Sequence, residues 1–284
     1  MNTTPEIMIA FNLDRALKLL SGEKSAPLAG GTDLVPGIHQ QAKRFAAIER
    51  LVDITRIPEL KQVNVKNSGT TIGAGVTFSE ILTHPRLGSE YPLLTKAAAT
   101  IGSVQIRNRA TIAGNFVNNA PCADSVPPLL VYDAIVRICS LKKSREIPLQ
   151  EFLLKPYKTQ LQTGELVTEI FLPPPPQNFG GDFYKLGRRR GVAISRITLA
   201  LLLQTEKKKI SGLRIAAGAV TPIGRRFYDI EHQYVGTEIS AAGLKFLAVN
   251  VGKAILEETG WRWSSPYKLP VTQQIVYQIL CKLT

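Results

Sequence analysis

Two glycine-centred segments in the first half of the chain restrict most strongly what it can fold into. The first is Leu-Ala-Gly-Gly-Thr-Asp-Leu-Val-Pro-Gly at residues 28–37, and the second runs from Arg107 through Asn115 to Ser125. Each joins an apolar run to small residues, a hydroxyl and an amide or carboxylate. Because glycine lacks a Cβ, such segments let the backbone approach the diphosphate of a dinucleotide closely. We therefore expect two loops that converge on one extended ligand.

The residues around the first segment predict a small parallel βαβ lobe. Asn12 can cap a short helix that starts at Leu13, and Gly22 follows its end. Residues 26–29 then resemble a short buried strand that leads into the glycine turn, with Thr32 or Asp33 as the cap of a following helical turn. Residues 49–55 are typical of a second strand, and the crossover between the two strands favours parallel pairing.

The pattern changes after Pro58 and indicates an α+β middle lobe. Residues 63–65 and 70–74 alternate with period two around Asn-Ser-Gly, which predicts a hairpin. Thr77 and Glu80 have the spacing of a capping box. The other elements expected in this lobe are a helix at 92–100 and strands at 134–140 and 166–172.

Four consecutive prolines at residues 173–176 mark the best domain boundary, because none of them can donate a ladder hydrogen bond. We assign residues 173–181 to a linker that is stiff at its start and flexible at its end. Beyond it, residues 183–187, 197–205 and 210–217 predict a three-stranded antiparallel sheet, and residues 240–259 and 271–283 predict two helices.

Composition excludes several classes of protein. The 284 residues are 44% hydrophobic and 20% charged, as in ordinary globular proteins, and no apolar run approaches the roughly 18 residues of a membrane span. The first residues have no basic segment followed by an apolar core, which predicts a cytoplasmic protein. Three scattered cysteines and three histidines offer no cluster or zinc spacing, so we expect no metal site.

The net charge of +13 is large, but the basic residues are dispersed. Only residues 188–190 and 207–209 form tight basic runs, and the second is typical of a solvated turn between strands. No aromatic residues are interleaved with basic ones in a nucleic-acid-binding pattern. An acidic protein partner is therefore favoured over nucleic acid.

Both glycine segments resemble the signatures of the FAD-binding medium subunit of molybdenum hydroxylases, the family of the xanthine dehydrogenase and carbon monoxide dehydrogenase flavoprotein subunits. Further similar segments follow in the family's order at residues 71–77, 184–189, 218–222 and 262–267. The resemblance implies an α+β protein. Its two-lobed FAD-binding domain, of the vanillyl-alcohol-oxidase (PCMH) type, would span residues 1–172, with lobes at about 1–56 and 57–172. A smaller C-terminal domain would span 182–284.

The resemblance also implies a function. The chain would be an oxidoreductase subunit that takes electrons from [2Fe–2S] clusters on a small partner subunit, beside a large molybdopterin subunit. It would pass them from FAD to NAD+ or another acceptor. The low cysteine count agrees with clusters on a partner, and part of the +13 charge would face it. A flavin-free assembly subunit and a stand-alone flavin reductase remain as alternatives.

The implied cofactor contacts lie in both segments and at scattered positions further along. No residue of the chain is assigned a catalytic role, because the cofactor carries the chemistry. The contacts are Pro27, Leu28, Ala29, Gly30, Gly31, Thr32, Asp33, Leu34, Val35, Ile101, Thr111, Ile112, Ala113, Gly114, Asn115, Asp124, Val167 and Lys185. The first loop would wrap the diphosphate, Asp124 would bind a ribose hydroxyl, and Ile101 would lie against the isoalloxazine.

Some of these residues have structural interpretations that stay open. Gly30 and Gly31 can form a plain turn, Asp124 can cap a helix at 126–132, and Ile101 can be a core residue. Residues 188–190 can be a solvated face or a nucleotide-binding one. Two departures from the family pattern, Ala113 for glycine and Ala193 for an acidic residue, bear on the approach to the cofactor and on the electron acceptor.

Overall fold

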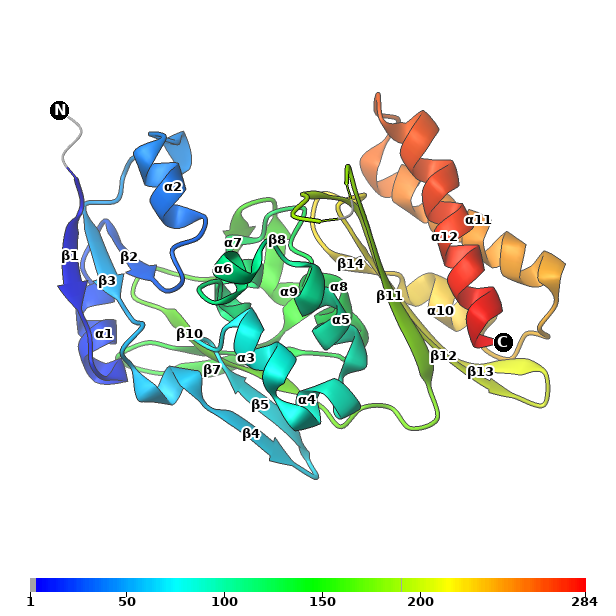
Figure 1. The fold of residues 1–284 in the computed structure, drawn as a ribbon, viewed down its shortest axis with the longest axis horizontal. Helices are drawn as coiled ribbons and strands as arrows, with labels where there is room; N and C mark the ends of the chain where they lie inside the picture. Colours follow the sequence, from blue (N-terminus) through cyan, green and yellow to red (C-terminus); the bar gives the residue numbers. More distant parts are fainter. Residues whose placement is uncertain (1–3, 190) are drawn as a thin grey trace.

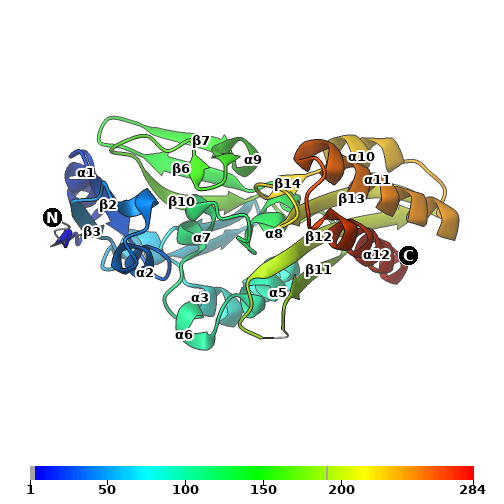
Figure 2. The same ribbon diagram turned by 90° about the horizontal axis from the view of Figure 1, so that it is seen from above.

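The structure is a computed structural model, and it describes residues 4–189 and 191–284. Three main β-sheets follow one another along the molecule, with three, five and four strands (Figure 1). The first sheet lies at one end, the C-terminal domain lies at the other, and the five-stranded sheet with its helices is between them in both views (Figures 1 and 2). The α+β class predicted from the sequence is confirmed.

The first lobe is a parallel sheet of order β1-β3-β2. Its elements are β1 (Glu6–Ile9), α1 (Leu13–Leu20), β2 (Ser25–Leu28), α2 (Leu34–His39), a 3-10 helix at Lys43–Phe45 and β3 (Arg50–Asp53). The predicted βαβ unit is confirmed, as is the Asn12 cap, whose Oδ1 accepts from the Arg15 backbone N–H at 2.9 Å. The sequence did not predict β1, because its edge position leaves most of its side chains exposed and removes the alternation of burial.

The second lobe is built on an antiparallel sheet of order β4-β5-β10-β6-β7. Its strands are β4 (Val63–Lys66), β5 (Gly69–Gly73), β6 (Ile135–Cys139), β7 (Ser144–Pro148) and β10 (Leu166–Leu172), with a separate hairpin of β8 (Leu153–Lys155) and β9 (Lys158–Thr159). The predicted 63–74 hairpin and the strand at 166–172 are confirmed.

Short helices accompany this sheet. They are a 3-10 helix at Pro58–Lys61, α3 (Phe78–Thr83), α4 (Pro85–Glu90), α5 (Pro92–Thr100), α6 (Val104–Arg107), α7 (Ile112–Asn118), α8 (Val126–Val131) and α9 (Leu149–Phe152). The capping box is confirmed at α3, where the Thr77 hydroxyl and the Glu80 carboxylate each accept the other residue's backbone N–H. The helix expected at 92–100 is confirmed as α5.

The C-terminal domain packs helices on a four-stranded antiparallel sheet of order β11-β12-β13-β14. Its elements are β11 (Gly180–Gly187), β12 (Ser195–Glu206), β13 (Lys209–Gly218), β14 (Arg225–Arg226), α10 (Tyr228–Tyr234), α11 (Ala241–Thr259) and α12 (Ser265–Leu283). The three predicted strands are confirmed, and β14 adds a fourth of only two residues, too short for a pattern. The last helix begins before the predicted residue 271 and includes Pro270.

The central strand β12 is buried on both faces, which explains its continuous apolar run. Leu199 and Leu201 belong to a core shared with α10, α11 and α12. Ala200 and Leu202 belong to a second core, which extends through the two N-terminal lobes. The C-terminal sheet is therefore a wall between two hydrophobic cores, and one of its faces packs directly on the second lobe.

Candidate functional site: a cleft between the two glycine loops

The first glycine loop leads from the end of β2 into α2. Gly31 adopts a φ of +71°, a conformation that side-chain-bearing residues rarely take, and this turns the chain sharply after Gly30. Among the described residues, the consecutive backbone N–H groups of Gly30 to Leu34 have no acceptor in the chain, and the first backbone bond of the helix is Val35 N–H to the Gly31 carbonyl. This loop therefore offers a row of unpaired donors to an anion.

The second glycine loop precedes α7 and uses its donors internally. The backbone N–H groups of Ile112 and Ala113 donate to the Val76 and Ala74 carbonyls, at 2.9 and 3.4 Å. Thr111 caps α7 by accepting the Gly114 N–H at 3.1 Å. These bonds fix the second loop against residues 74–76 of the same lobe. The donors that it can offer to a ligand are therefore those of its side chains.

Asn115 fixes the position of the following helix. Its Oδ1 accepts from the Ser125 hydroxyl at 2.7 Å, which joins α7 to the start of α8. Among the described residues, the side-chain amide N–H groups of Asn115 and the hydroxyl hydrogen of Thr111 have no acceptor in the chain. Both side chains line the cleft described below, where these donors are available.

The two loops lie in direct contact. A Cβ built on Gly30 would lie 2.0 Å from the carbonyl oxygen of Arg109, a distance that no real Cβ tolerates. Glycine at position 30 is therefore required by the second loop itself. Arg44 adds a link, because its guanidinium pairs with Asp33 at 2.5 Å and reaches the Asn118 side chain at 3.3 Å.

A cleft of about 540 Å³ lies between the two lobes, and both loops line it. Its volume falls within the range of roughly 300–1,000 Å³ that is usual for ligand sites. The predicted contacts that line the cleft are Pro27, Ala29, Gly30, Gly31, Thr32, Asp33, Leu34, Thr111, Ala113, Gly114, Asn115 and Val167. Leu28, Val35 and Ile112 belong to the same two segments but do not line it. Ile112 is fully buried in the core.

Sequence reasoning missed one wall of the cleft, the loop at residues 161–165 before β10. Glu165 holds this loop in place. Its two carboxylate oxygens accept from Arg145 at 3.0 and 2.8 Å, and one of them also accepts the Gln162 backbone N–H at 3.0 Å. The Arg145 hydrogen bond lowers the pKa of Glu165. Gly164, with a φ of +78°, was the one signal of a constrained loop in the sequence.

Three predicted contacts form a separate cluster outside the cleft. The Lys185 ammonium donates to one oxygen of Asp124 at 2.6 Å and to the carbonyl of Thr100, the residue before Ile101, at 2.8 Å. The other Asp124 oxygen accepts from the Ser195 hydroxyl. Burial raises the pKa of Asp124 even though Lys185 opposes the shift. Asp124 does not cap α8, whose N-cap is Ser125, so that interpretation is wrong.

The arginine run at residues 188–190 is described only in part. Arg189 donates to the carbonyls of Gly191 and Val192, at 3.0 and 2.8 Å, and thereby stabilises its own turn. Arg190 lies outside the described residues. The solvated and the nucleotide-binding interpretations of this run therefore both remain predictions.

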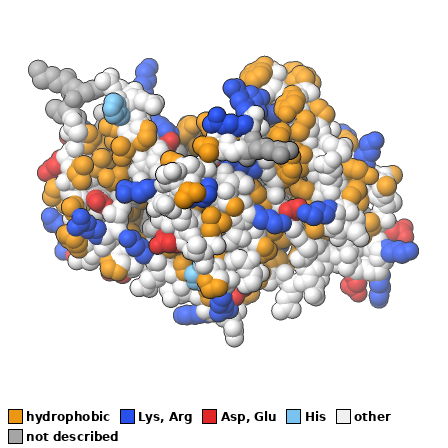
Figure 3. Space-filling view, viewed as in Figure 1, with side chains coloured by type: hydrophobic (Ala, Val, Ile, Leu, Met, Phe, Trp, Pro, Cys, Tyr) orange, Lys and Arg blue, Asp and Glu red, His pale blue; other side chains and the backbone are white. Residues whose placement is uncertain are grey.

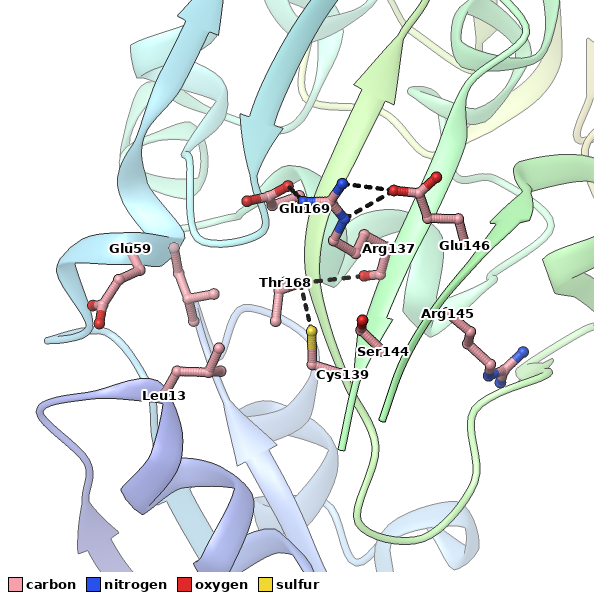
Figure 4. A pocket seen from close by; sticks show the side chains of 10 residues that line it. Leu13, Glu59, Arg137, Cys139, Ser144, Arg145, Glu146, Thr168 and Glu169 are labelled. Atoms are coloured by element: carbon pink, nitrogen blue, oxygen red, sulfur yellow. Dashed lines mark hydrogen bonds and ion pairs between the residues drawn. The ribbon is translucent and has the colours of Figure 1, made fainter. Parts of the chain in front are cut away.

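A second cavity of about 540 Å³ lies beside β6, β7 and β10 of the five-stranded sheet. Figure 4 shows Arg137 between Glu146 and Glu169, facing Glu59 and Leu13 across the cavity. Arg137 pairs with the two glutamates at 2.6 and 2.9 Å. Because two glutamates outnumber the arginine between them, this cavity suits an anionic ligand far less than the cleft between the loops.

A two-lobed cleft lined by small residues and unpaired backbone donors defines a protein that binds a dinucleotide cofactor. Residues 3–175 match the family model described as FAD binding domain in molybdopterin dehydrogenase, and residues 182–283 match the CO dehydrogenase flavoprotein C-terminal domain. The chain therefore belongs to the family of FAD-binding subunits of molybdenum hydroxylases, and it is an oxidoreductase subunit that binds FAD.

Relatives and solved structures agree with this assignment. The chain is 30% identical over 274 residues to a xanthine dehydrogenase FAD-binding subunit of Escherichia coli O157:H7, covering 95% of this chain and 93% of the relative. It is 31% identical over 266 residues to a glyceraldehyde dehydrogenase medium chain of Sulfolobus acidocaldarius, covering 93% and 92%. A chain of carbon monoxide dehydrogenase from Hydrogenophaga pseudoflava superposes with a TM-score of 0.90 at 28% identity, covering 100% and 98%.

In the part of the chain that the structure describes, no helix combines the length and the apolar character needed to cross a membrane.

Proposed function

We propose that this chain holds FAD between its two N-terminal lobes and connects an iron–sulfur subunit of its complex to NAD+ or another electron acceptor. One observation carries the proposal: the row of unpaired N–H donors at Gly30 to Leu34 faces a cleft of about 540 Å³ that the second glycine loop closes from the other side. Backbone donors in such a row suit the diphosphate of a dinucleotide.

The residues present fit this cofactor. Gly30 to Leu34 would hold the diphosphate through backbone donors, while Thr111 and Asn115 would donate from their side chains on the opposite wall. Val167 and Ala113 would pack against the cofactor, since both line the cleft and neither brings a charge. Ala113, which replaces the family's glycine, thus has its methyl group in the cleft wall and leaves the cavity open.

Ile101, Asp124 and Lys185 would contact the cofactor beyond the cleft. Their grouping supports this assignment, because Lys185 joins Asp124 to the residue before Ile101. Ser195, which the sequence did not indicate, would hold the second Asp124 oxygen. Lys185 is thereby fixed in one position with its charge balanced.

FAD, when bound, supplies exchange of one or two electrons, which suits a link between iron–sulfur clusters and a two-electron acceptor. The chain itself would bind and orient the cofactor and exclude water around it. The [2Fe–2S] small subunit, the large molybdopterin subunit and the cytoplasmic location remain proposals. So does the division at residues 173–181.

The test is to purify the chain, denature it and measure the absorbance of the released flavin, with about one FAD per chain expected. Gly30→Ala should release FAD, because the new methyl group pushes the Arg109 carbonyl away and separates the loops. Gly88→Ala is the matched control, since a Cβ there meets nothing within 4 Å. Equal FAD content in the two variants would refute the site.

The electron-transfer step needs its own measurement. The complex, reduced by its substrate without oxygen, is mixed with NAD+, and formation of NADH is followed by absorbance. NADH formation that is lost in flavin-depleted complex supports the proposed acceptor. A complex that assembles normally around a flavin-free chain would instead support the scaffold alternative.

A further inference from the structure

The loop between α11 and α12 exposes two tryptophans, which are the only tryptophans of the chain. Trp261 is 70% exposed and Trp263 is 86% exposed, and Tyr267 on the first turn of α12 is 51% exposed. Figure 3 shows hydrophobic side chains gathered over this top edge of the C-terminal domain, beside a group of basic ones. Tryptophan is rarely left so exposed, because each side chain has about 150–250 Å² that gains from burial.

Two hydrogen bonds hold the backbone of the loop that carries these aromatic residues. The Ser265 hydroxyl accepts the Arg262 backbone N–H at 2.8 Å, and the Ser265 N–H donates back to the Arg262 carbonyl at 2.9 Å. Ser265 itself is buried, so this pair of bonds is shielded from water. A preformed loop loses little entropy when it binds, which is the property expected of an interface anchor.

Three cations, Arg196, Arg262 and Lys268, lie close to one another at this loop. Arg262 and Lys268 line one small pocket beside α11 and α12. In agreement, Arg196 and Arg262 lower the pKa of Lys268, after the larger effect of burial. Among the described residues none of these three forms an ion pair. The nearby carboxylate of Glu258 is engaged by Arg225 at 3.0 Å. Burial raises the pKa of Glu258 while Arg225 and Arg262 oppose the shift, so one carboxylate lies against several cations and the cluster keeps an excess of positive charge.

We propose that Trp261, Trp263, Tyr267 and Arg262 form a docking surface for an acidic, partly apolar face of another subunit of the enzyme complex. This inference rests on the proposed function, because it requires that the chain works within a complex. The partner would bring a carboxylate to the cationic cluster and an apolar pocket to the tryptophans. Trp, Tyr and Arg are the residues that most often carry the energy of protein interfaces.

A second copy of this chain fits the surface less well. In a two-fold dimer the same patch would face itself, so the Arg262 clusters would repel one another without a carboxylate between them. A membrane with anionic lipids offers the right charge, but similar proteins are named as a subunit or a medium chain of an enzyme. A partner subunit is therefore the occupant that the observations favour.

The test compares variants of the tagged chain in their affinity for the subunits that copurify with it. We expect the double variant Trp261→Ser/Trp263→Ser to weaken association by roughly tenfold or more, as for buried aromatic anchors. Arg262→Glu should weaken it as well, and more strongly at about 50 mM than at about 500 mM salt. The controls Phe246→Ser and Lys245→Glu change exposed residues of α11 and should leave the affinity unchanged.

A second measurement locates the contact directly. Hydroxyl-radical footprinting should show Trp261 and Trp263 labelled in the isolated chain and protected in the complex, while Phe246 is labelled equally in both. FAD content is measured for every preparation. If the chain lacks FAD yet associates through its tryptophans, the proposed function fails and this inference stands.

Several outcomes would overturn the inference. Equal tryptophan labelling in chain and complex would do so, as would unchanged affinity in both variants, or failure of the wild-type chain to join the partner subunits. Binding of phosphatidylserine vesicles that requires the tryptophans, with subunit affinity unaffected, would replace the partner by a membrane. Tryptophan-dependent self-association with unaffected subunit affinity would replace it by a second copy.

Discussion

The two glycine segments look alike in sequence but are used in opposite ways. The first loop leaves the N–H groups of Gly30 to Leu34 unpaired beside the cleft, whereas the second bonds its N–H groups to Val76, Ala74 and its own Thr111. The first loop thus offers backbone donors to a ligand, whereas the second has its backbone donors bonded within the protein and offers side chains only. The difference shows that small residues at a turn do not by themselves reveal whether the turn serves a cofactor or the packing of the chain.

The contrast continues to the end of the second segment, at Asp124. Both oxygens of this carboxylate are already bonded, to Lys185 and to Ser195, and its side chain is only 7% exposed. The first segment has its own carboxylate, Asp33, which is 52% exposed and pairs with Arg44 at the rim. Variants that disturb one segment and spare the other can therefore separate cofactor binding from stability.

Asp124→Ala should have the largest effect on stability. It leaves the Lys185 ammonium buried without its partner, and breaking a buried ion pair on one side costs about 3–5 kcal/mol. Chemical denaturation of the apoprotein should show this loss, and the FAD-loaded protein should lose at least as much, because Asp124 would also contact the cofactor. Asp33→Ala, at the exposed pair, is the control and should lose under about 1 kcal/mol. If Asp124→Ala lowered FAD affinity without lowering apoprotein stability, the second segment would not be a satisfied wall.

Gly30→Ala should be next in size, because it breaks the contact between the segments. The added methyl group would lie 2.0 Å from the Arg109 carbonyl oxygen, and such overpacking costs about 1–3 kcal/mol. FAD affinity should fall by more than apoprotein stability does, since the row of donors moves away from the opposite wall. Thermal unfolding with and without FAD measures both quantities. A loss of equal size in the two states would mean that the donors of the first loop do not contact FAD.

The sequence predicted the local elements near this site well. Residues 26–29, 92–100 and 166–172 each carried a local signal, such as a cap or a bounded apolar run, and the structure places β2, α5 and β10 there to within a residue or two. Both segments also converge on one cleft, as the sequence led us to expect. Local chemistry decides these features, so a single sequence contains them.

Other features depend on distant partners and were beyond sequence reasoning. The closeness of Gly30 to Arg109 arises from the packing of two lobes, and nothing near Gly30 in the sequence indicates it. Ser195 meets Asp124 across 71 positions of the chain. The loop at residues 161–165 lines the cleft, and Arg145 on the distant strand β7 bonds its Glu165. Bonds between remote segments leave no periodic trace in either segment.

Glu165→Gln tests the loop at residues 161–165, which forms a third wall of the cleft, through the pH dependence of its stability. The pKa of Glu165 is lowered from 4.5 in the folded state, chiefly by Arg145, so its contribution to stability is present above 4.5 and is lost as the pH falls through the lowered value. The variant should lose about 1–2 kcal/mol near neutral pH. Its stability should then vary less with pH in the acid range than that of wild type. Denaturant midpoints across that range measure both. Parallel pH profiles for the two proteins would exclude the Arg145 pair as the anchor of the loop.

Thr111→Val should have the smallest effect on stability. It separates two functions of the Thr111 hydroxyl, which caps α7 and can donate to a ligand in the cleft. The hydroxyl of Thr111 accepts the Gly114 N–H, and loss of such a cap costs about 1 kcal/mol. Its hydrogen is also free to donate into the cleft, so FAD affinity should fall beyond what the lost cap explains. Thr111→Ser keeps both functions and should behave like wild type. If the valine variant lost the stability of the cap but bound FAD unchanged, Thr111 would serve only the fold, and the contrast between the two loops would be sharper.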